Sequence, residues 1–86
     1  MNEITVTNLS ACGGGVPDLL IGYSGKNYLA EVKNPLQANS DQRLTPAQQK
    51  YHLEWRGQVS IIRYTQELLE IINYMEEQGD SGDTRR

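Results

Sequence analysis

Two carboxylates and one lysine lie at a spacing that suits the hydrolysis of phosphodiester bonds. Asp18 follows a proline, and Glu31 and Lys33 flank Val32 further along the chain. Carboxylate and carbonyl oxygens are the ligands that Mg²⁺ prefers, so Asp18, Glu31 and the Val32 carbonyl form a candidate metal site. A bound metal polarises a phosphoryl oxygen, and a lysine ammonium beside it stabilises the developing negative charge. The pattern predicts a hydrolytic centre that uses Mg²⁺ or Mn²⁺.

A predicted hairpin brings the two carboxylates together. The apolar segments on either side of the turn signal Ser24-Gly25 are typical of its two strands. If the loop holds two or four residues, the register places Asp18 directly opposite Glu31, with Cβ atoms roughly 4.5–5.5 Å apart. A three-residue loop would shift that register, and in either case Lys33 lies on the Glu31 face of its strand. Two like charges directly opposite each other destabilise a sheet, so this geometry favours a bound divalent cation. The alternative is that Asp18 or Glu31 forms an ordinary surface ion pair with Lys33.

The remaining elements follow from the periodicity of the sequence. Two further strands are predicted at residues 4–8 and 59–64, and two helices at residues 46–56 and 66–77. Thr45 and Gln48 fit the capping box of the first helix, and Gly57 fits its C-cap. The second helix begins after a cap at Thr65 and presents one apolar face, made of Leu68, Leu69, Ile72 and Met75.

The order strand, strand, strand, helix, strand, helix predicts one α/β domain, in which helices flank a mixed central sheet. The domain covers residues 1–77, and the Gly- and charge-rich residues 78–86 form a disordered acidic and polar tail. Chains below roughly 70–80 residues seldom build a large core, so we expect this chain to form a homodimer.

Composition excludes several classes of protein. No apolar run approaches the ~18 residues of a membrane span, and no signal peptide is visible, so we expect a cytoplasmic protein without a membrane partner. Cys12 is the only cysteine, which allows neither an internal disulfide nor a cysteine-based zinc site. The net charge of −3 argues against a simple basic nucleic-acid binder, but residues 76–86 alone contribute −2 of that charge.

Three segments of the chain together resemble one nuclease family. They are Gly14-Gly15-Val16-Pro17-Asp18-Leu19-Leu20-Ile21-Gly22, Glu31-Val32-Lys33 and Leu44-Thr45-Pro46-Ala47-Gln48. The combination is similar to the virus-type replication-repair nuclease (VRR-NUC) family of the PD-(D/E)xK nucleases, over residues 5–75. The resemblance implies a central sheet flanked by helices, and Mg²⁺- or Mn²⁺-dependent cleavage of branched, Holliday junction-like DNA by a homodimer. It further implies a bacterial or phage-infected host cell as the setting and no nucleotide cofactor.

The resemblance also implies roles for single residues. Asp18 and Glu31 match the metal-binding carboxylates, and Lys33 matches the catalytic lysine. Gln48 matches the helical glutamine of the family motif. The family's N-terminal helix, which carries a further acidic residue, is missing here, and Glu3 is a poor match for that acid. The site then works with two carboxylates, receives the acid from elsewhere, or has reduced activity.

Several helix residues have two interpretations each. Gln48 is either a capping-box residue that bonds back to the Thr45 amide or a site residue. His52 lies one turn later on the same helix face, where it either contacts DNA phosphate and assists proton transfer or packs within the domain. Tyr51 and Trp55 either stack on unpaired bases or form core or dimer contacts.

The basic residues and the glycine run also have alternative interpretations. The candidate phosphate contacts are Lys26, Arg43, Lys50 and Arg56, with a solvated surface role as the alternative. Gly13-Gly14-Gly15 is a flexible lead-in to Asp18 or a point where the backbone closely approaches DNA.

The sequence therefore favours a metal-dependent DNA endonuclease. The alternative is a nuclease-like dimer that holds branched DNA, or another partner, and cuts weakly or not at all, because the additional acid is missing. A restriction-type nuclease ranks last, since so short a chain offers no target-recognition segment.

Overall fold

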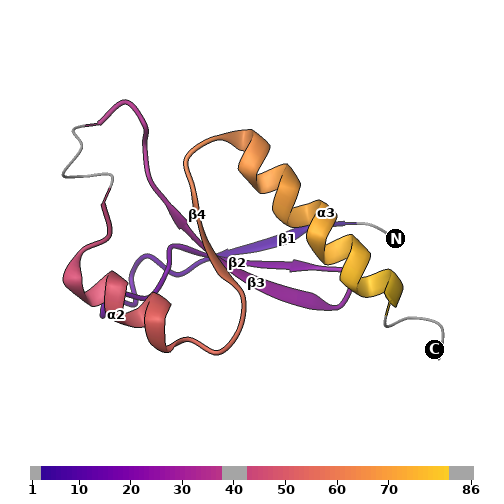
Figure 1. Cartoon of the computed structure of the whole chain (residues 1–86), viewed down its shortest axis with the longest axis horizontal. Coiled ribbons are helices and arrows are strands. Elements are labelled where there is room, and N and C mark those ends of the chain that lie inside the picture. The colour runs from indigo at the N-terminus through magenta and orange to yellow at the C-terminus, as the bar shows by residue number, and fades with distance from the viewer. Residues whose placement is uncertain (1–2, 38–42, 82–86) are drawn as a thin grey trace.

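The computed structural model describes residues 3–37 and 43–81, with side chains described as far as residue 77. In chain order these residues form β1 (Thr5–Asn8), β2 (Leu19–Tyr23), β3 (Lys26–Val32), α2 (Pro46–Glu54), β4 (Val59–Ile62) and α3 (Thr65–Ser81) (Figure 1). The strands pair in the order β1-β2-β3-β4, antiparallel except for the parallel pair β3 and β4. The predicted order of elements and the mixed α/β sheet are confirmed, and each strand ends within two residues of its predicted bounds. Within the described residues, no helix is long and apolar enough to cross a membrane.

The hairpin between β2 and β3 turns at Ser24-Gly25, as predicted. Both residues have positive φ, 54° and 76°, which is the pattern of a two-residue type I′ turn. The two strands then pair from the turn as far as Leu19 with Ala30. Asp18 and Glu31 come next along the two strands, so the register from which the carboxylates were expected to face each other is confirmed.

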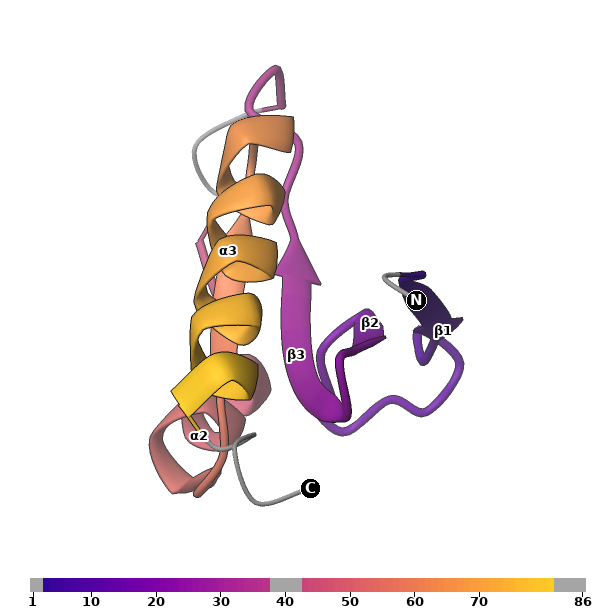
Figure 2. The same cartoon turned by 90° about the vertical axis from the view of Figure 1, so that its right-hand side faces the viewer.

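The hydrophobic core lies between one face of the sheet and α3. It consists of six buried residues, Ile21, Tyr23, Ala30, Ile62, Ile71 and Met75. Alternate strand positions reach this core because side chains two residues apart share a face of a sheet. Figure 2 shows α3 running alongside β3, with β1 farthest from the helix. The stability of the domain therefore depends chiefly on the α3 side of the sheet.

The first turn of α3 differs from its prediction. Thr65 lies inside the helix rather than capping it. The Glu67 carboxylate instead accepts hydrogen bonds from the Arg63 and Tyr64 amides, which the first helical turn leaves without partners. These bonds lower the pKa of Glu67.

The far end and the apolar face of α3 also differ from their predictions. The helix continues to Ser81, so the predicted tail begins inside it, and residues 82–86 lie outside the described residues. Leu69 is 57% exposed and does not belong to the apolar face, whereas Ile71 is buried. The reason is helical spacing, because positions 68, 71, 72 and 75 form one stripe and position 69 points away from it.

The helix α2 connects the parallel strands β3 and β4 and begins as predicted. Thr45 Oγ1 accepts a hydrogen bond from the Gln48 amide, and Gln48 Oε1 accepts one from the Thr45 amide, which completes the capping box. Pro46 occupies the first turn, where its missing N–H costs nothing. None of the α2 residues is buried, so polar contacts rather than a core stripe hold this helix in place.

The predicted end of α2 is wrong. The helix ends at Glu54, and Trp55 follows as an extended C-cap whose amide donates to the Tyr51 carbonyl at 2.9 Å. Gly57 is not the C-cap, because the chain has already left the helix. Its role is spatial, since a Cβ at that position would lie 2.8 Å from the indole nitrogen of Trp55.

Candidate active site

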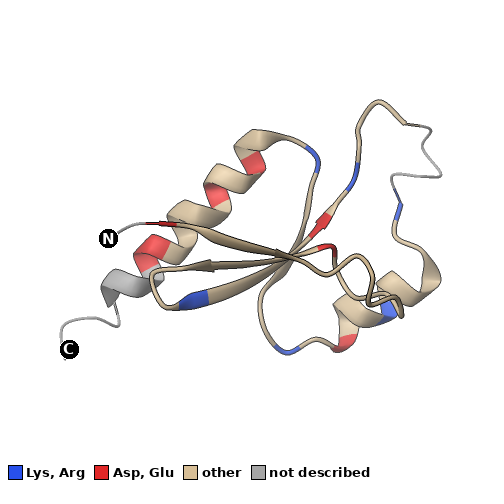
Figure 3. Cartoon of the chain, turned by 180° about the vertical axis from the view of Figure 1, so that it is seen from behind, with Lys and Arg blue, Asp and Glu red and all other residues tan. Residues whose placement is uncertain are grey.

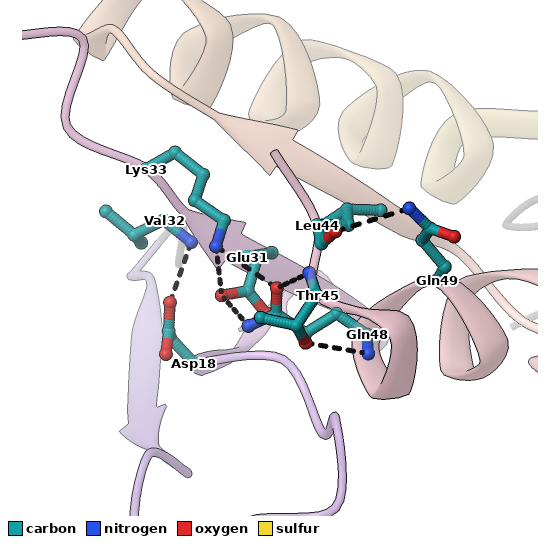
Figure 4. A network of polar contacts seen from close by, with 8 residues as sticks. All are labelled: Asp18, Glu31, Val32, Lys33, Leu44, Thr45, Gln48 and Gln49. Carbon is teal, nitrogen blue, oxygen red and sulfur yellow. Dashed lines mark hydrogen bonds and ion pairs between the residues drawn. The ribbon is translucent and has the colours of Figure 1, made fainter. Parts of the chain in front are cut away.

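The candidate site lies where β2 begins and β3 ends, beside the first turn of α2 (Figure 4). Asp18 directly precedes β2, and its Oδ2 accepts a hydrogen bond of 2.9 Å from the Val32 amide at the end of β3. The N–H and C=O groups of one strand residue point to the same edge, so the Val32 carbonyl also faces the Asp18 side. The hairpin thus brings Asp18, Glu31 and this carbonyl to one corner of the sheet.

Glu31 is the buried charged residue of this corner, with 2% of its surface exposed. Its Oε2 accepts a hydrogen bond of 3.1 Å from Gln48 Nε2 and lies 3.9 Å from Lys33 Nζ. Its Oε1 is buried and has no hydrogen-bond partner in the described part of the chain. A buried carboxylate oxygen without a partner is unfavourable, so this oxygen is suited to receive a cation or a proton.

The protonation of Glu31 reflects the same crowding. Burial raises the pKa of Glu31, and the neighbouring Asp18, which can share a proton with Glu31 and whose charge repels a second carboxylate, raises it further, to about 7. The positive charge of Lys33 acts in the opposite direction and lowers this pKa. Two carboxyl groups that resist carrying two negative charges are the arrangement that a divalent cation would relieve.

Gln48 links the lysine to the carboxylate (Figure 4). Its Oε1 accepts a hydrogen bond of 3.1 Å from Lys33 Nζ, and its Nε2 donates to Glu31. The same Oε1 accepts a hydrogen bond of 2.8 Å from the Thr45 amide. The capping box therefore fixes which end of the Gln48 side-chain amide faces Lys33. Gln48 therefore caps α2 and orders the polar residues of the corner at the same time, and its two interpretations are compatible.

Gly15 sets how closely the loop before β2 approaches α2. It has φ of +82°, and a Cβ built on it would overlap the Ala47 carbonyl and lie 2.9 Å from the Gln48 amide nitrogen. Gly13 and Gly14 also have positive φ but meet nothing within 4 Å. The sequence predicted either a flexible lead-in to Asp18 or a close approach of this run to DNA, whereas the structure shows that Gly15 approaches the first turn of α2. Only the packed structure identifies which glycine is in contact.

His52 lies on α2, one turn after Gln48, and faces inward. Its Nε2 is buried and has no hydrogen-bond partner within residues 3–37 and 43–77. Burial and, secondarily, the positive charge of Lys33 lower the pKa of His52. His52 is therefore held as the neutral imidazole near Lys33, which allows one ring nitrogen to accept a proton.

The other predicted DNA contacts do not converge on the carboxylates. Lys26 begins β3, five residues before Glu31, and a rise of about 3.3 Å per residue places it about 16 Å away along the strand. Arg43 and Lys50 are both exposed, the first ahead of α2 and the second on it. Lys26 therefore cannot contact the phosphate that lies at the carboxylates, whereas Arg43 and Lys50 are exposed to a DNA strand.

Charge is nevertheless unevenly distributed over the molecule. Residues 26–63 carry six Lys and Arg residues and three Asp and Glu residues, whereas α3 carries five acids and no base. Figure 3 shows the acidic residues along α3 and most of the basic ones towards the α2 end. The candidate site thus lies at the more positive end of the molecule.

The residues at the corner fit a hard divalent cation. Within the described residues, no group of three or more His, Cys, Asp and Glu side chains could hold a metal ion. Asp18, Glu31 and the Val32 carbonyl offer three oxygen ligands, and Mg²⁺ typically takes one or two carboxylates and fills its other positions with water and phosphate oxygens. Glu3 does not contribute, because it lines a surface hollow beside Ser24-Gly25, at the opposite end of β2 from Asp18.

Comparison with known proteins adds no further information about this site. The chain matches no family model, no curated protein and no solved structure at a significant level.

Proposed function

We propose that the chain is an Mg²⁺- or Mn²⁺-dependent DNA endonuclease that cuts branched DNA as a homodimer. One observation supports this proposal most directly. Glu31 is a buried carboxylate with one oxygen that has no hydrogen-bond partner among the described residues, and it lies against Lys33 and beside Asp18. A buried carboxylate whose pKa is raised beside a second acid and a lysine marks a candidate functional site.

Each residue of the corner has a distinct task in this proposal. Asp18, Glu31 and the Val32 carbonyl hold the metal, which when bound polarises the phosphoryl group and lowers the pKa of a water ligand. Lys33 donates a hydrogen bond to an oxygen of the scissile phosphate, where negative charge develops. Hydrolysis forms a bond between the water oxygen and phosphorus and breaks the bond to the leaving oxygen, which takes up a proton.

Gln48 keeps Lys33 and Glu31 in position for this reaction. The capping box fixes the side-chain amide of Gln48, which accepts a hydrogen bond from Lys33. Because this amide is neutral, it holds the lysine without adding another charge to the site. Lys33 is already restricted, with 10% of its side chain exposed, so it loses little conformational freedom when a phosphate binds. Pre-positioned donors of this kind stabilise a transition state more than mobile ones do.

The arrangement of elements agrees with the resemblance to the VRR-NUC family. The resemblance implies two carboxylates and a lysine on a hairpin, with a glutamine on a helix after it, in a sheet flanked by helices. β2, β3 and α2 supply the matching residues in that order. This agreement is the support for a PD-(D/E)xK-type fold.

Surface features support the DNA substrate and the homodimer. The positive end of the molecule carries the site, and Lys and Arg contacts to phosphates dominate the affinity for DNA. The edge strand β1 has four exposed residues, and Ile4 and Val6 are 47% and 54% exposed. An exposed apolar edge strand is a surface that a second copy of the chain can cover.

One observation favours a weaker activity. Glu3, the acid upstream of Asp18, lies at the far end of β2, so within residues 3–37 and 43–77 the corner has two carboxylates. A second candidate function is therefore a nuclease-like module that binds branched DNA and cuts it slowly or not at all.

A cleavage panel distinguishes the two functions. Single-stranded, duplex, flap and four-way DNA are incubated with Mg²⁺ or Mn²⁺ and with wild type, Asp18→Asn or Glu54→Gln. Glu54 is an exposed acid on α2 outside the site, so its variant controls for the loss of one negative charge. The endonuclease proposal requires product with wild type and Glu54→Gln but none with Asp18→Asn. Tight junction binding without product at any metal concentration supports the binding module instead.

A further inference from the structure

A hollow adjoins the candidate site between α2 and the sheet. It has a volume of about 520 Å³, and its apolar lining includes Leu20, Leu29, Tyr51 and Trp55. Volumes of roughly 300–1,000 Å³ are typical of sites that bind small molecules. The sheet face under α2 is therefore incompletely covered.

Two stacked aromatic rings form one wall of the hollow. The ring centroids of Tyr51 and Trp55 lie 5.6 Å apart with an angle of 18° between the planes. Trp55 is 43% exposed and α2 has no buried residue, so the pair is not part of the core. An exposed stack of this kind offers a flat surface onto which a third ring can be added.

Polar groups lie at the rim of the same hollow. Lys26, Asn27 and Gln58 line it, and Lys26 has no ion-pair partner within residues 3–37 and 43–77. A nucleobase presents a flat π-face together with hydrogen-bond donors and acceptors on its edge. Its phosphate adds a negative charge, which an unpaired lysine complements.

We propose that this hollow binds an unpaired nucleobase of the DNA strand, stacked on the Tyr51–Trp55 pair. The inference deepens the proposed function and rests on it for the identity of the polymer. Leu29 lies two residues before Glu31 on the same face of β3, and Tyr51 lies one turn after Gln48 on α2. The hollow and the carboxylate corner are thus neighbours along both elements. Lys26 lies at the far end of the hollow, so a DNA strand that runs from Lys26 past a base held on the Tyr51–Trp55 pair leads towards Lys33 at the other end.

The consequence is a preference for DNA with a free base beside the cut. In a continuous duplex each base must first be unstacked and unpaired, which costs a few kcal/mol. At branch points, flaps and bulges, bases are already unstacked and unpaired, so binding does not have to supply this free energy. The hollow would therefore favour branched substrates through the bases, independently of the charge on the backbone.

Trp55 makes the proposal directly measurable, because it is the only tryptophan in the chain. Wild-type protein in EDTA is titrated with a ten-residue oligothymidine and with an abasic strand of equal length and charge, while Trp55 fluorescence is recorded. Stacking of one base on an aromatic side chain changes affinity by roughly 5- to 150-fold. We expect quenching by oligothymidine and binding of the abasic strand at least fivefold weaker. Equal affinity for both strands, or unchanged emission on binding, overturns the proposal.

Variants on one helix separate stacking from general weakening. Tyr51→Leu keeps an apolar side chain but removes the ring, and we expect it to weaken oligothymidine binding at least fivefold without affecting the abasic strand. Leu53→Ala is the matched control, since Leu53 is 81% exposed on the same helix. Its affinities should equal those of wild type. An equal loss for both strands in Tyr51→Leu, measured by anisotropy of labelled DNA, contradicts base stacking.

The outcomes also separate this inference from the proposed nuclease activity. Base-dependent binding without metal-dependent cleavage removes the nuclease proposal and keeps the hollow as a base site. Cleavage by a protein that binds both strands equally keeps the nuclease and removes the base site. A shift in Trp55 emission with protein concentration alone, in the absence of DNA, shows that a second copy of the chain occupies the hollow, which overturns the proposal.

Discussion

The two sides of the sheet are built on different principles. On the α3 side, Ile71 and Met75 are buried against strand residues, and the helix contributes directly to the core. On the α2 side, the helix buries no residue, and Gln48 attaches it to the sheet through hydrogen bonds to Lys33 and Glu31. Stability and the candidate chemistry therefore occupy opposite faces of one sheet.

β3 illustrates how one strand serves both sides. Ala30 points into the core and is fully buried, while the next residue, Glu31, points to the opposite face and into the polar corner. The core side fixes the position of the backbone, so Glu31 can be held in an unfavourable environment. Proteins commonly accept such a local loss of stability where a functional site requires it.

The largest expected effect separates activity from stability. Asp18→Asn and Lys33→Ala should each reduce metal-dependent cleavage at least about 100-fold, since removing one group that stabilises transition-state charge costs about 10²- to 10³-fold even where its neighbours remain. Neither side chain belongs to the core on the α3 side, so both variants should remain folded. Cleavage assays and urea unfolding measure the two effects. Full activity in either variant would contradict the role assigned to that residue.

The opposite behaviour is expected on the α3 side. Met75→Ala removes a side chain that is 1% exposed and should lower the free energy of unfolding by about 3 kcal/mol. Cleavage per folded molecule should remain within about twofold, because Met75 touches no residue of the corner. Leu69→Ala is the control, since that side chain is 57% exposed. A selective loss of activity in Met75→Ala at full folding would show that the two sides are coupled.

The pH dependence of the free energy of unfolding should show that ionised Glu31 lowers the stability of the folded state, as expected for a residue that serves function rather than stability. Folding raises the pKa of Glu31 from 4.5 to about 7, so the folded state favours the protonated form. Its stabilising contribution is complete below pH 4.5 and is lost as the pH rises through 7. Because glutamine does not titrate, Glu31→Gln should not lose this stability as the pH rises. At pH 8 in EDTA the variant should be more stable than wild type, by at most about 3 kcal/mol.

Chemical unfolding at pH 4, 6 and 8 measures this difference. The stability gap between Glu31→Gln and wild type should grow with pH, and Mg²⁺ should narrow it at pH 8 by stabilising wild type alone. The control Glu54→Gln should follow wild type at every pH. A gap that stays constant across this range would show that Glu31 titrates as an ordinary carboxyl group.

Much of the fold could be predicted because its signals are local. The Ser24-Gly25 turn fixes the hairpin register, and that register alone places Asp18 opposite Glu31. The capping box of α2 is equally local, since Thr45 and Gln48 are three residues apart. In each of these cases the residues that determine the geometry lie within a few positions of one another.

The errors concern features that depend on packing between distant segments. The sequence placed Leu69 on the apolar face of α3, but the phase of the stripe is set by where β2 and β4 meet the helix, which selects Ile71. The end of α2 was misplaced because Trp55 leaves the helix to lie beside Gly57. The double role of Gln48 likewise depends on β3 and α2 meeting, so the sequence left cap and site as alternatives.

The smallest expected effect tests how α2 is docked. Gly15→Ala introduces a Cβ that overlaps the Ala47 carbonyl, so the first turn of α2 must move away and draw Gln48 from Lys33 and Glu31. Gly13→Ala is the matched control, because its φ of +70° imposes a similar conformational cost of roughly 1–2 kcal/mol while its Cβ meets nothing within 4 Å. Gly15→Ala should therefore lose more stability than Gly13→Ala, because the clash with α2 adds to the conformational cost that the two variants share. Only Gly15→Ala should lose about tenfold in cleavage and shift Trp55 emission, since a displacement of about 1 Å in a positioned group has effects of this size or larger. If the two variants lost activity equally, backbone strain in the loop rather than the contact with α2 would position Gln48.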